Sequence, residues 1–60
     1  MMITVTDPDG IEYDVDVELI EQVNFGNITE IFLHTGEILH CIENYKQFCR
    51  KVVMQYVGGW

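Results

Sequence analysis

Two histidines and two cysteines have the greatest potential for metal or nucleophilic chemistry in this sequence. His34, His40, Cys41 and Cys49 are of the residue types that zinc prefers as ligands. Their spacing matches none of the common zinc patterns, which need close pairs of cysteines or histidines. The histidines flank a predicted turn and could approach each other across a hairpin. We favour ordinary strand positions for them and buried apolar positions for the cysteines, and so predict no metal site and no cofactor.

Other catalytic groups are scarce. The chain contains no serine. Asp14 and Asp16 could form an acid/base pair, but neighbours on an exposed strand face lack the burial that shifts the pKa of a carboxylate. The glycines are scattered over predicted turns and form no phosphate-binding loop. We therefore expect no enzymatic activity.

Charge is distributed unevenly along the 60 residues. All ten acidic residues lie between Asp7 and Glu43, the three bases are Lys46, Arg50 and Lys51, and the formal net charge is −7. The clusters of lysine and arginine that nucleic acids and anionic membranes require are absent. Two explanations for the acids stay open: they keep a small protein dispersed in water, or they meet a partner with a basic surface.

The acidic residues show their clearest pattern between residues 11 and 21. Residues 11–17 alternate between apolar and acidic, which is typical of a strand with one buried face. Like charges two residues apart on one strand face repel each other modestly, and no lysine or arginine precedes residue 46 to relieve this. We predict that a protein partner binds an acidic set made up of Glu12, Asp14, Asp16, Glu18 and Glu21.

Short strands and one helix must position these side chains. β-branched runs between turn motifs predict strands at 2–6, 11–17, 28–34 and 38–42. Residues 16–23 predict a short helical turn capped by Asp16. A longer helix should begin after Asn44, with Gln47 completing a capping box, and end at the glycines near the C-terminus. The sequence predicts a single α+β domain, residues 1–60, with a small antiparallel sheet of two hairpins covered by the C-terminal helix.

The apolar stripe of this helix is too wide for a small sheet to cover completely. A chain of 60 residues buries a small core and is often stabilised by oligomerisation. Aromatic residues are enriched at the centres of interfaces. We therefore predict a homodimer with two-fold symmetry, or a higher homo-oligomer, formed through Tyr45, Phe48, Val52, Tyr56 and Trp60.

Cysteine content and hydropathy suggest a compartment. Two cysteines are fewer than a secreted domain of this size usually carries. The chain does not open with the charged and apolar regions of a signal peptide, and no apolar run has the length of a membrane helix. We expect a cytoplasmic protein with reduced thiols and no membrane insertion.

The order of these motifs resembles the small flagellar FlbD family, the SwrD-type motility proteins. The matching segments, spread over residues 2–55, are residues 3–6, Gly10, residues 19–21, residues 32–36 and residues 42–43. They correspond to a first strand, a turn ending in glycine, a strand running into Leu-Ile-Glu, a strand followed by a Thr-Gly turn, and an acidic residue before the helix. The resemblance implies a small cytoplasmic non-enzyme that acts through protein contacts.

The expected function is that of a regulatory or inhibitory protein that binds another macromolecule without catalysis. Small acidic inhibitors of this kind are common in phages and mobile elements, and by analogy with them we expect an origin of that kind for this chain. Two alternatives stay open. The first is the flagellar or swarming accessory role implied by the resemblance. The second is an oligomer that sequesters a small ligand in a pocket between subunits.

Overall fold

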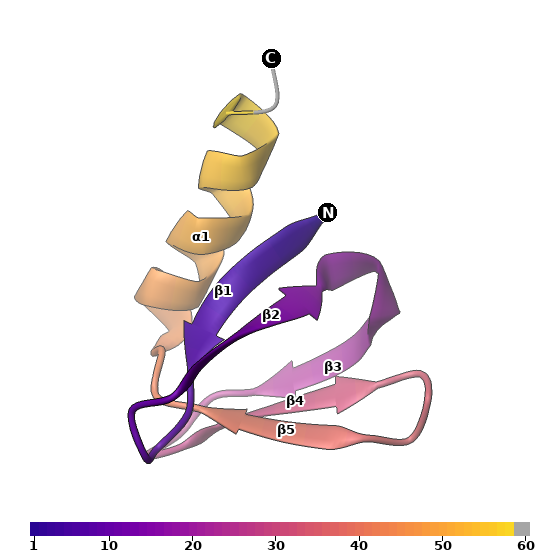
Figure 1. Cartoon of the computed structure of the whole chain (residues 1–60), viewed down its shortest axis with the longest axis vertical. Helices are drawn as coiled ribbons and strands as arrows, with labels where there is room; N and C mark the ends of the chain where they lie inside the picture. The colour runs from indigo at the N-terminus through magenta and orange to yellow at the C-terminus, as the bar shows by residue number, and fades with distance from the viewer. Residues whose placement is uncertain (59–60) are drawn as a thin grey trace.

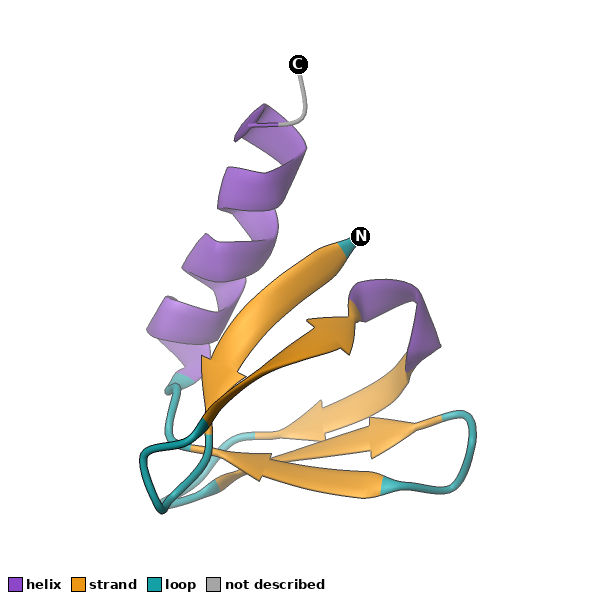
Figure 2. Cartoon of the chain, viewed as in Figure 1, coloured by secondary structure: helices purple, strands orange, loops and turns teal. Residues whose placement is uncertain are grey.

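Turn residues divide the first 41 residues into short strands, and one helix follows. The computed structural model describes residues 1–58 (Figures 1 and 2). The elements are β1 (Met2–Thr6), β2 (Glu12–Asp16), the 3₁₀ turn η1 (Val17–Leu19), β3 (Ile20–Asn24), β4 (Thr29–Leu33), β5 (Ile38–Cys41) and α1 (Tyr45–Gly58). The strands form an antiparallel β1–β2 pair and an antiparallel sheet of order β3-β4-β5. This confirms the predicted α+β class, with two hairpins and a C-terminal helix.

The first hairpin is shaped by the turn at residues 7–10. The Asp7 carboxylate accepts hydrogen bonds from the backbone N–H groups of Asp9 and Ile11, both at 2.9 Å. Gly10 has φ +88°, in the left-handed region that a side chain would strain. In the resulting register Val5 faces Tyr13 and Thr4 faces Asp14. The predicted alternation holds within the strand, but Ile11 lies before β2 and is 63% exposed.

Strand β4 is the centre of the second sheet. Its alternate residues Thr29, Ile31 and Leu33 are buried, which is the pattern of a strand with one face toward the core. The turn into β5 contains Gly36 at φ +94°, and the Gly36 N–H donates to the Leu33 carbonyl at 3.0 Å. The predicted strands at 28–34 and 38–42 are therefore present; β4 lacks one predicted residue at each end, and β5 lacks the last one.

The helical turn predicted for residues 16–23 is wrong over most of its length. Asp16 does cap a turn, because its carboxylate accepts a hydrogen bond from the Glu18 N–H, but the turn is a single 3₁₀ turn. The chain then becomes strand β3, whose Val23 pairs with Ile31 of β4. Leu19, Ile20 and Val23 fit a helical period and a strand equally well, and pairing with the buried strand β4 favours the strand.

Helix α1 packs mainly against β1 and extends beyond the ends of the strands (Figure 1). Asn44 and Gln47 form the predicted capping box, with reciprocal hydrogen bonds of 2.9 Å. Phe48 is the residue of the helix that enters the core, at 7% exposure, and Phe25 meets its ring edge-on at 5.7 Å. The core consists of the buried residues Ile3, Val5, Val15, Ile31, Leu33, Cys41 and Phe48.

Glu43 joins the two sheets to the helix, and it is buried despite its charge, with 5% of its surface exposed. Both of its carboxylate oxygens accept the Thr6 N–H, at 3.0 and 3.1 Å. The Lys51 ammonium lies 3.2 Å from the same carboxylate and donates to the Thr4 carbonyl at 2.6 Å. The Glu43 carbonyl accepts the hydroxyl of Thr29 in β4. Strands β1 and β4 and helix α1 are therefore tied together at one buried residue.

The ionised form of Glu43 is favoured in the folded state. Burial alone would raise the pKa of this carboxyl group. The backbone N–H groups of Thr6 and of Glu43 itself, together with Lys51, outweigh the effect of burial and hold the pKa below its ordinary value of 4.5. Because the unfolded chain then binds a proton at Glu43 more readily than the folded chain, acid favours unfolding.

We predict that the contribution of Glu43 to the unfolding free energy is constant from neutral pH down to about 5. This contribution falls as the pH drops through 4.5 toward the lower folded-state pKa of Glu43. Glu43→Gln should lower the unfolding free energy at pH 7 by roughly 1–3 kcal/mol, because Lys51 loses its counter-charge and Thr6 loses a charged acceptor. The same variant should lose that part of the acid dependence. Urea unfolding between pH 7 and pH 3 measures both.

Glu30→Gln is the matched control, because Glu30 is half-buried and meets only the His40 ring at 3.7 Å. We expect this change to cost about 0.5 kcal/mol or less. Equal stability of Glu43→Gln and the unmodified chain at pH 7 would contradict the role assigned to Glu43.

Candidate functional site

Two of the predicted partner-binding acids lie side by side on the outer face of the β1–β2 hairpin. Glu12 and Asp14 alternate with the inward residues Tyr13 and Val15, and both are exposed. The Asp14 carboxylate accepts the Thr4 hydroxyl of the neighbouring strand at 2.7 Å, which fixes its direction. No lysine or arginine pairs with either acid. This face presents two negative charges to solvent from a paired, positioned strand.

The other three predicted acids are placed differently. Asp16 is half-buried, caps η1 and lies 3.6 Å from the N-terminal ammonium, so its charge is used within the chain. Glu18 projects from η1, and Glu21 lies at the irregularity between Ile20 and Gln22 in β3. Both are exposed, but they lie on η1 and β3, outside the β1–β2 hairpin that carries Glu12 and Asp14. The structure therefore divides the predicted set of five acids into two groups.

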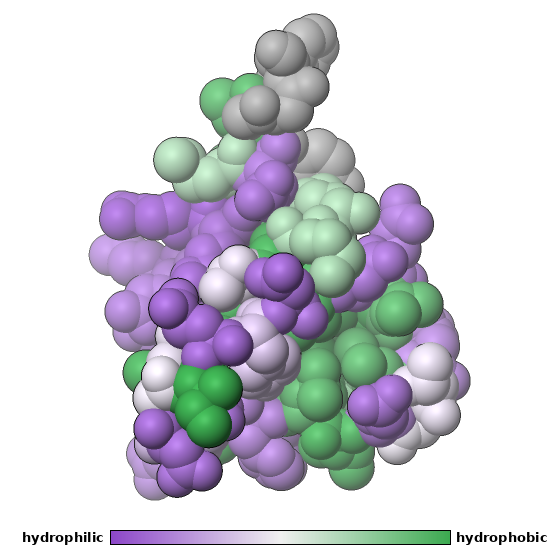
Figure 3. Space-filling model, viewed as in Figure 1, coloured by the Kyte–Doolittle hydropathy of each residue, from purple (hydrophilic) through white to green (hydrophobic). Residues whose placement is uncertain are grey.

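The acidic surface is not compensated by bases. All three bases lie on α1, which carries no acid. Of the ten acidic residues, which all fall within residues 1–58, only Glu43 pairs with a lysine or arginine. Hydrophilic colour covers much of the visible surface in Figure 3, while apolar colour gathers over the three-stranded sheet. The sheets are thus negative and the helix is positive.

The residues predicted for self-association separate into core and surface. Phe48 is buried in the chain's own core and Val52 is half-buried against it, so the structure places Phe48 away from the exposed surface of the helix. Tyr45 is 66% exposed and meets Phe25 edge-on at 5.2 Å. The Tyr56 side chain and Trp60 lie outside the described residues. In addition to Tyr45, the exposed apolar residues among the described part of α1 are Val53, Met54 and Val57.

The histidines and cysteines are not brought together. The register places His40 opposite Glu30 and leaves exposed His34 at the turn. Cys41 is fully buried, whereas Cys49 is half-buried on α1. Burial raises the pKa of the Cys41 thiol and the nearby Glu43 charge adds to this, although a backbone hydrogen bond at Glu43 works the other way. Within residues 1–58, no three side chains among His, Cys, Asp and Glu form a group that could hold a metal ion.

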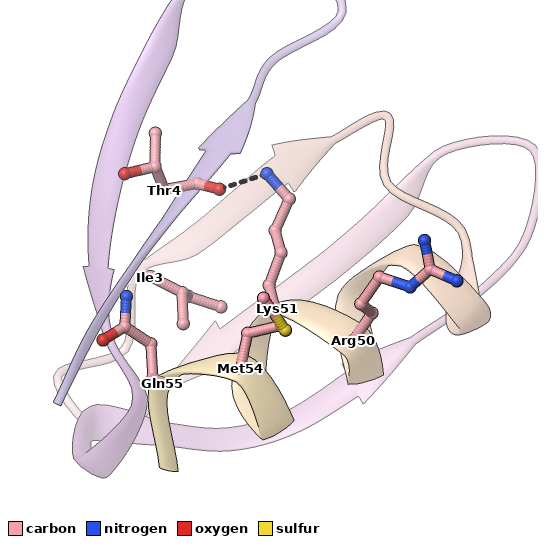
Figure 4. Close-up of a pocket in the computed structure, with 6 residues that line it drawn as sticks. All are labelled: Ile3, Thr4, Arg50, Lys51, Met54 and Gln55. Atoms are coloured by element: carbon pink, nitrogen blue, oxygen red, sulfur yellow. Dashed lines mark hydrogen bonds between the residues drawn. The ribbon is translucent and has the colours of Figure 1, made fainter. Parts of the chain in front are cut away.

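A hollow of about 300 Å³ lies between β1 and α1 (Figure 4). It is lined by Ile3, Thr4, Arg50, Lys51, Met54 and Gln55. The Lys51 ammonium reaches across it to the Thr4 carbonyl, and the Arg50 guanidinium points away from that contact. Because the two bases do not converge, the hollow does not form a site for an anion.

A second hollow, of about 320 Å³, lies beside β5. Its lining residues are Asp7, Pro8, Tyr13, Ile38, Leu39 and His40. The Tyr13 hydroxyl donates to the His40 carbonyl at 2.7 Å, and burial raises the pKa of that hydroxyl with help from neighbouring negative charges. The Asp7 carboxylate is occupied by the N–H groups of the turn. This groove combines apolar walls, one acid and the edge of a sheet, which suits the binding of a chain more than catalysis on a small molecule.

The groove and the Glu43 junction are the two features that the sequence did not reveal. Both depend on residues far apart in the chain, such as Tyr13 with His40 and Thr6 with Glu43. A partial signal was present, because the predicted strand at 28–34 was apolar on both faces at Phe32. Strands of that kind are often covered twice.

No protein-family model, curated protein or solved structure matches this chain. Across residues 1–58, no helix is both long and apolar enough to cross a lipid bilayer.

We predict that the purified protein binds no zinc at stoichiometric levels, because the buried Cys41 thiol resists forming the thiolate that zinc requires. After incubation with one equivalent of zinc and desalting, elemental analysis should find about 0.1 zinc per chain or less. Cys41→Val, which removes the thiol at similar volume, should give the same value. One zinc per chain, lost in Cys41→Val, would contradict this assignment.

Proposed function

We propose that this chain is a non-catalytic binding protein that regulates or inhibits a protein with a basic surface. The observation that carries the proposal is the uncompensated charge of the sheets. Within residues 1–58, nine of the ten acids lack a lysine or arginine partner, since Glu43 alone has one, and all three lysine and arginine residues lie on α1. Such a charged face attracts a basic partner over long range and increases the association rate.

Glu12 and Asp14 are the residues best placed to make the first contact. They lie on a paired strand, so little conformational freedom is lost when a partner binds them. Asp16 is left out of the binding face because its carboxylate already serves η1 and the N-terminal ammonium. Glu18 and Glu21 extend the negative field without sharing the same face.

The flagellar or swarming accessory role remains an alternative, supported by the order of motifs in the sequence. In that case the basic partner belongs to the motility apparatus, and deletion of the gene reduces swarming. Unchanged motility in the deletion strain dismisses this alternative and leaves the general binding function in place.

We predict that Glu12→Gln/Asp14→Asn lowers the association rate with the basic partner several-fold at low ionic strength. The partner is first identified by pull-down from host lysate, and rates are then measured by surface plasmon resonance. The difference should disappear near 1 M salt, where the screening length is about 3 Å. Thermal melting should stay close to that of the unmodified chain, since both side chains are exposed.

Glu18→Gln/Glu21→Gln is the matched control, because it removes the same charge from η1 and β3. A smaller effect is expected, since these acids lie away from the hairpin face. Association that does not depend on salt, or equal effects of the two double variants, would contradict a specific role for Glu12 and Asp14.

We also propose that two copies associate through the exposed apolar residues of α1. Val53→Gln/Val57→Gln should then shift the sedimentation coefficient to that of a 7.0 kDa monomer. Ile11→Gln changes a residue of similar exposure on the first turn and should leave the coefficient unchanged. A monomeric unmodified chain at tens of micromolar would dismiss the dimer.

A further inference from the structure

Strand β5 is an edge strand, and its outer side carries unpaired backbone groups. It pairs only with β4, in the order β3-β4-β5. In a strand, the N–H and C=O of one residue point to the same side and alternate from residue to residue. The His40 carbonyl bonds to the Tyr13 hydroxyl, and the Ile42 N–H bonds to the Thr6 carbonyl, so even-numbered residues point away from β4.

A hydrogen bond at the turn before β5 gives the same direction for the backbone groups of this strand. The Leu33 N–H donates to the Glu37 carbonyl at 2.9 Å, which places the odd-numbered residues of this segment toward β4. Ile38 and His40 therefore point outward. In residues 1–58, no hydrogen bond satisfies the Ile38 N–H, the Ile38 carbonyl or the His40 N–H. These three groups form a short template onto which another extended chain can add.

The other edge strands, β1, β2 and β3, differ from β5. On β1, Lys51 binds the Thr4 carbonyl, and Glu43 and Ile42 bind the N–H and the carbonyl of Thr6. Strand β3 has an irregular register between Ile20 and Gln22, and irregular edges are less suited to pairing. Strand β2 carries three acids, of which Asp14 and Asp16 bind the Thr4 hydroxyl and the N-terminal ammonium. Strand β5 has neither a bulge nor a charged residue, and Ile38 is 51% exposed.

The surroundings of β5 favour a basic chain. The groove of about 320 Å³ beside it is lined by Asp7 together with the apolar surfaces of Pro8, Tyr13 and Leu39, and by no lysine or arginine. Glu37 immediately precedes the strand and is exposed, and Glu30 lies opposite His40. An extended segment with alternating basic and apolar side chains can place its backbone on Ile38 and His40, its apolar groups in the groove and its charges near these acids.

We propose that β5 binds an extended, basic segment of the partner protein by strand addition at Ile38 and His40. The inference rests on the proposed function, because the occupant is the basic partner, and it adds the means by which the partner is held. A second copy of this chain is the weaker occupant. Pairing two β5 edges would bring together the negative sheets of two molecules that each carry a net charge of −7.

The test uses the full chain and a synthetic peptide, N-acetyl-(Lys-Val)₃-Lys-amide. On binding, amide exchange measured by NMR should slow at Ile38 and His40, because their N–H groups gain partners. The Leu39 and Cys41 amides, which already face β4, serve as internal controls. The backbone N-methylated peptide, which keeps the charges but has no backbone N–H donors, and the Glu-Val analogue should bind at least fivefold more weakly.

Ile38→Pro removes one outward N–H and no bond to β4, at the first residue of an edge strand where proline is tolerated. It should weaken peptide binding about fivefold or more. Ile38→Thr keeps the N–H and the β-branched shape, and should bind within about twofold of the unmodified chain. Thermal melting establishes that each variant is folded, and the peptide analogues test the same bond without changing the protein.

Several results would overturn strand addition. One is a folded Ile38→Pro that binds the peptide normally, another is peptide binding without slower exchange at Ile38 and His40, and a third is equal binding of the N-methylated peptide. A dimer in the absence of peptide that Ile38→Pro dissociates would assign the edge to a second copy instead. If Glu12→Gln/Asp14→Asn reduces association with the lysate partner while Ile38→Pro does not, the proposed function stands and the edge assignment fails.

Discussion

The fold depends on one buried carboxylate, Glu43, at the point where the second sheet ends and the helix begins. Its oxygens bind the last N–H of β1, and its counter-ion Lys51 reaches back from the second turn of α1 to the Thr4 carbonyl. A buried charge is costly unless it is both paired and hydrogen-bonded, and here both conditions are met. The same carboxylate therefore fixes both the position of the helix on β1 and the junction of the two sheets.

The Glu43–Lys51 ion pair also affects the distribution of charge over the molecular surface. Lys51 is one of only three bases, and it is occupied by the internal pair. Lys46 and Arg50 are exposed on α1, and in residues 1–58 neither of them pairs with an acid of the sheets. A chain whose sheets are negative and whose helix is weakly positive is electrically asymmetric. The same ion pair that stabilises the core thus leaves the sheets with the charge on which binding is proposed to depend.

Local patterns predicted local structure well in this chain. The alternation around Tyr13, the turn glycines Gly10 and Gly36 and the Asn44–Gln47 capping box all act over a few residues, and all are present. The failures concern distant contacts. Residues 20–24 form strand β3 because they pair with β4, and Phe48 is buried because residues far from it in the chain build the core that covers it. The acids Glu12 and Asp14 were located correctly on one strand face, whereas the internal use of Asp16 depends on the N-terminus.

The incomplete closure of the sheets follows from the chain's small size. Strands β1 and β5 belong to different sheets and are joined by a hydrogen bond from the Ile42 N–H, just after β5, to the Thr6 carbonyl at the end of β1. Beyond that bond the turn at residues 7–10 and the Tyr13 side chain separate the two sheets, and a groove remains. An additional strand there would satisfy Ile38 and His40 and cover the apolar surface, which the chain itself is too short to do. In a domain of this size, the edge that the fold leaves open is where a partner segment gains most by binding.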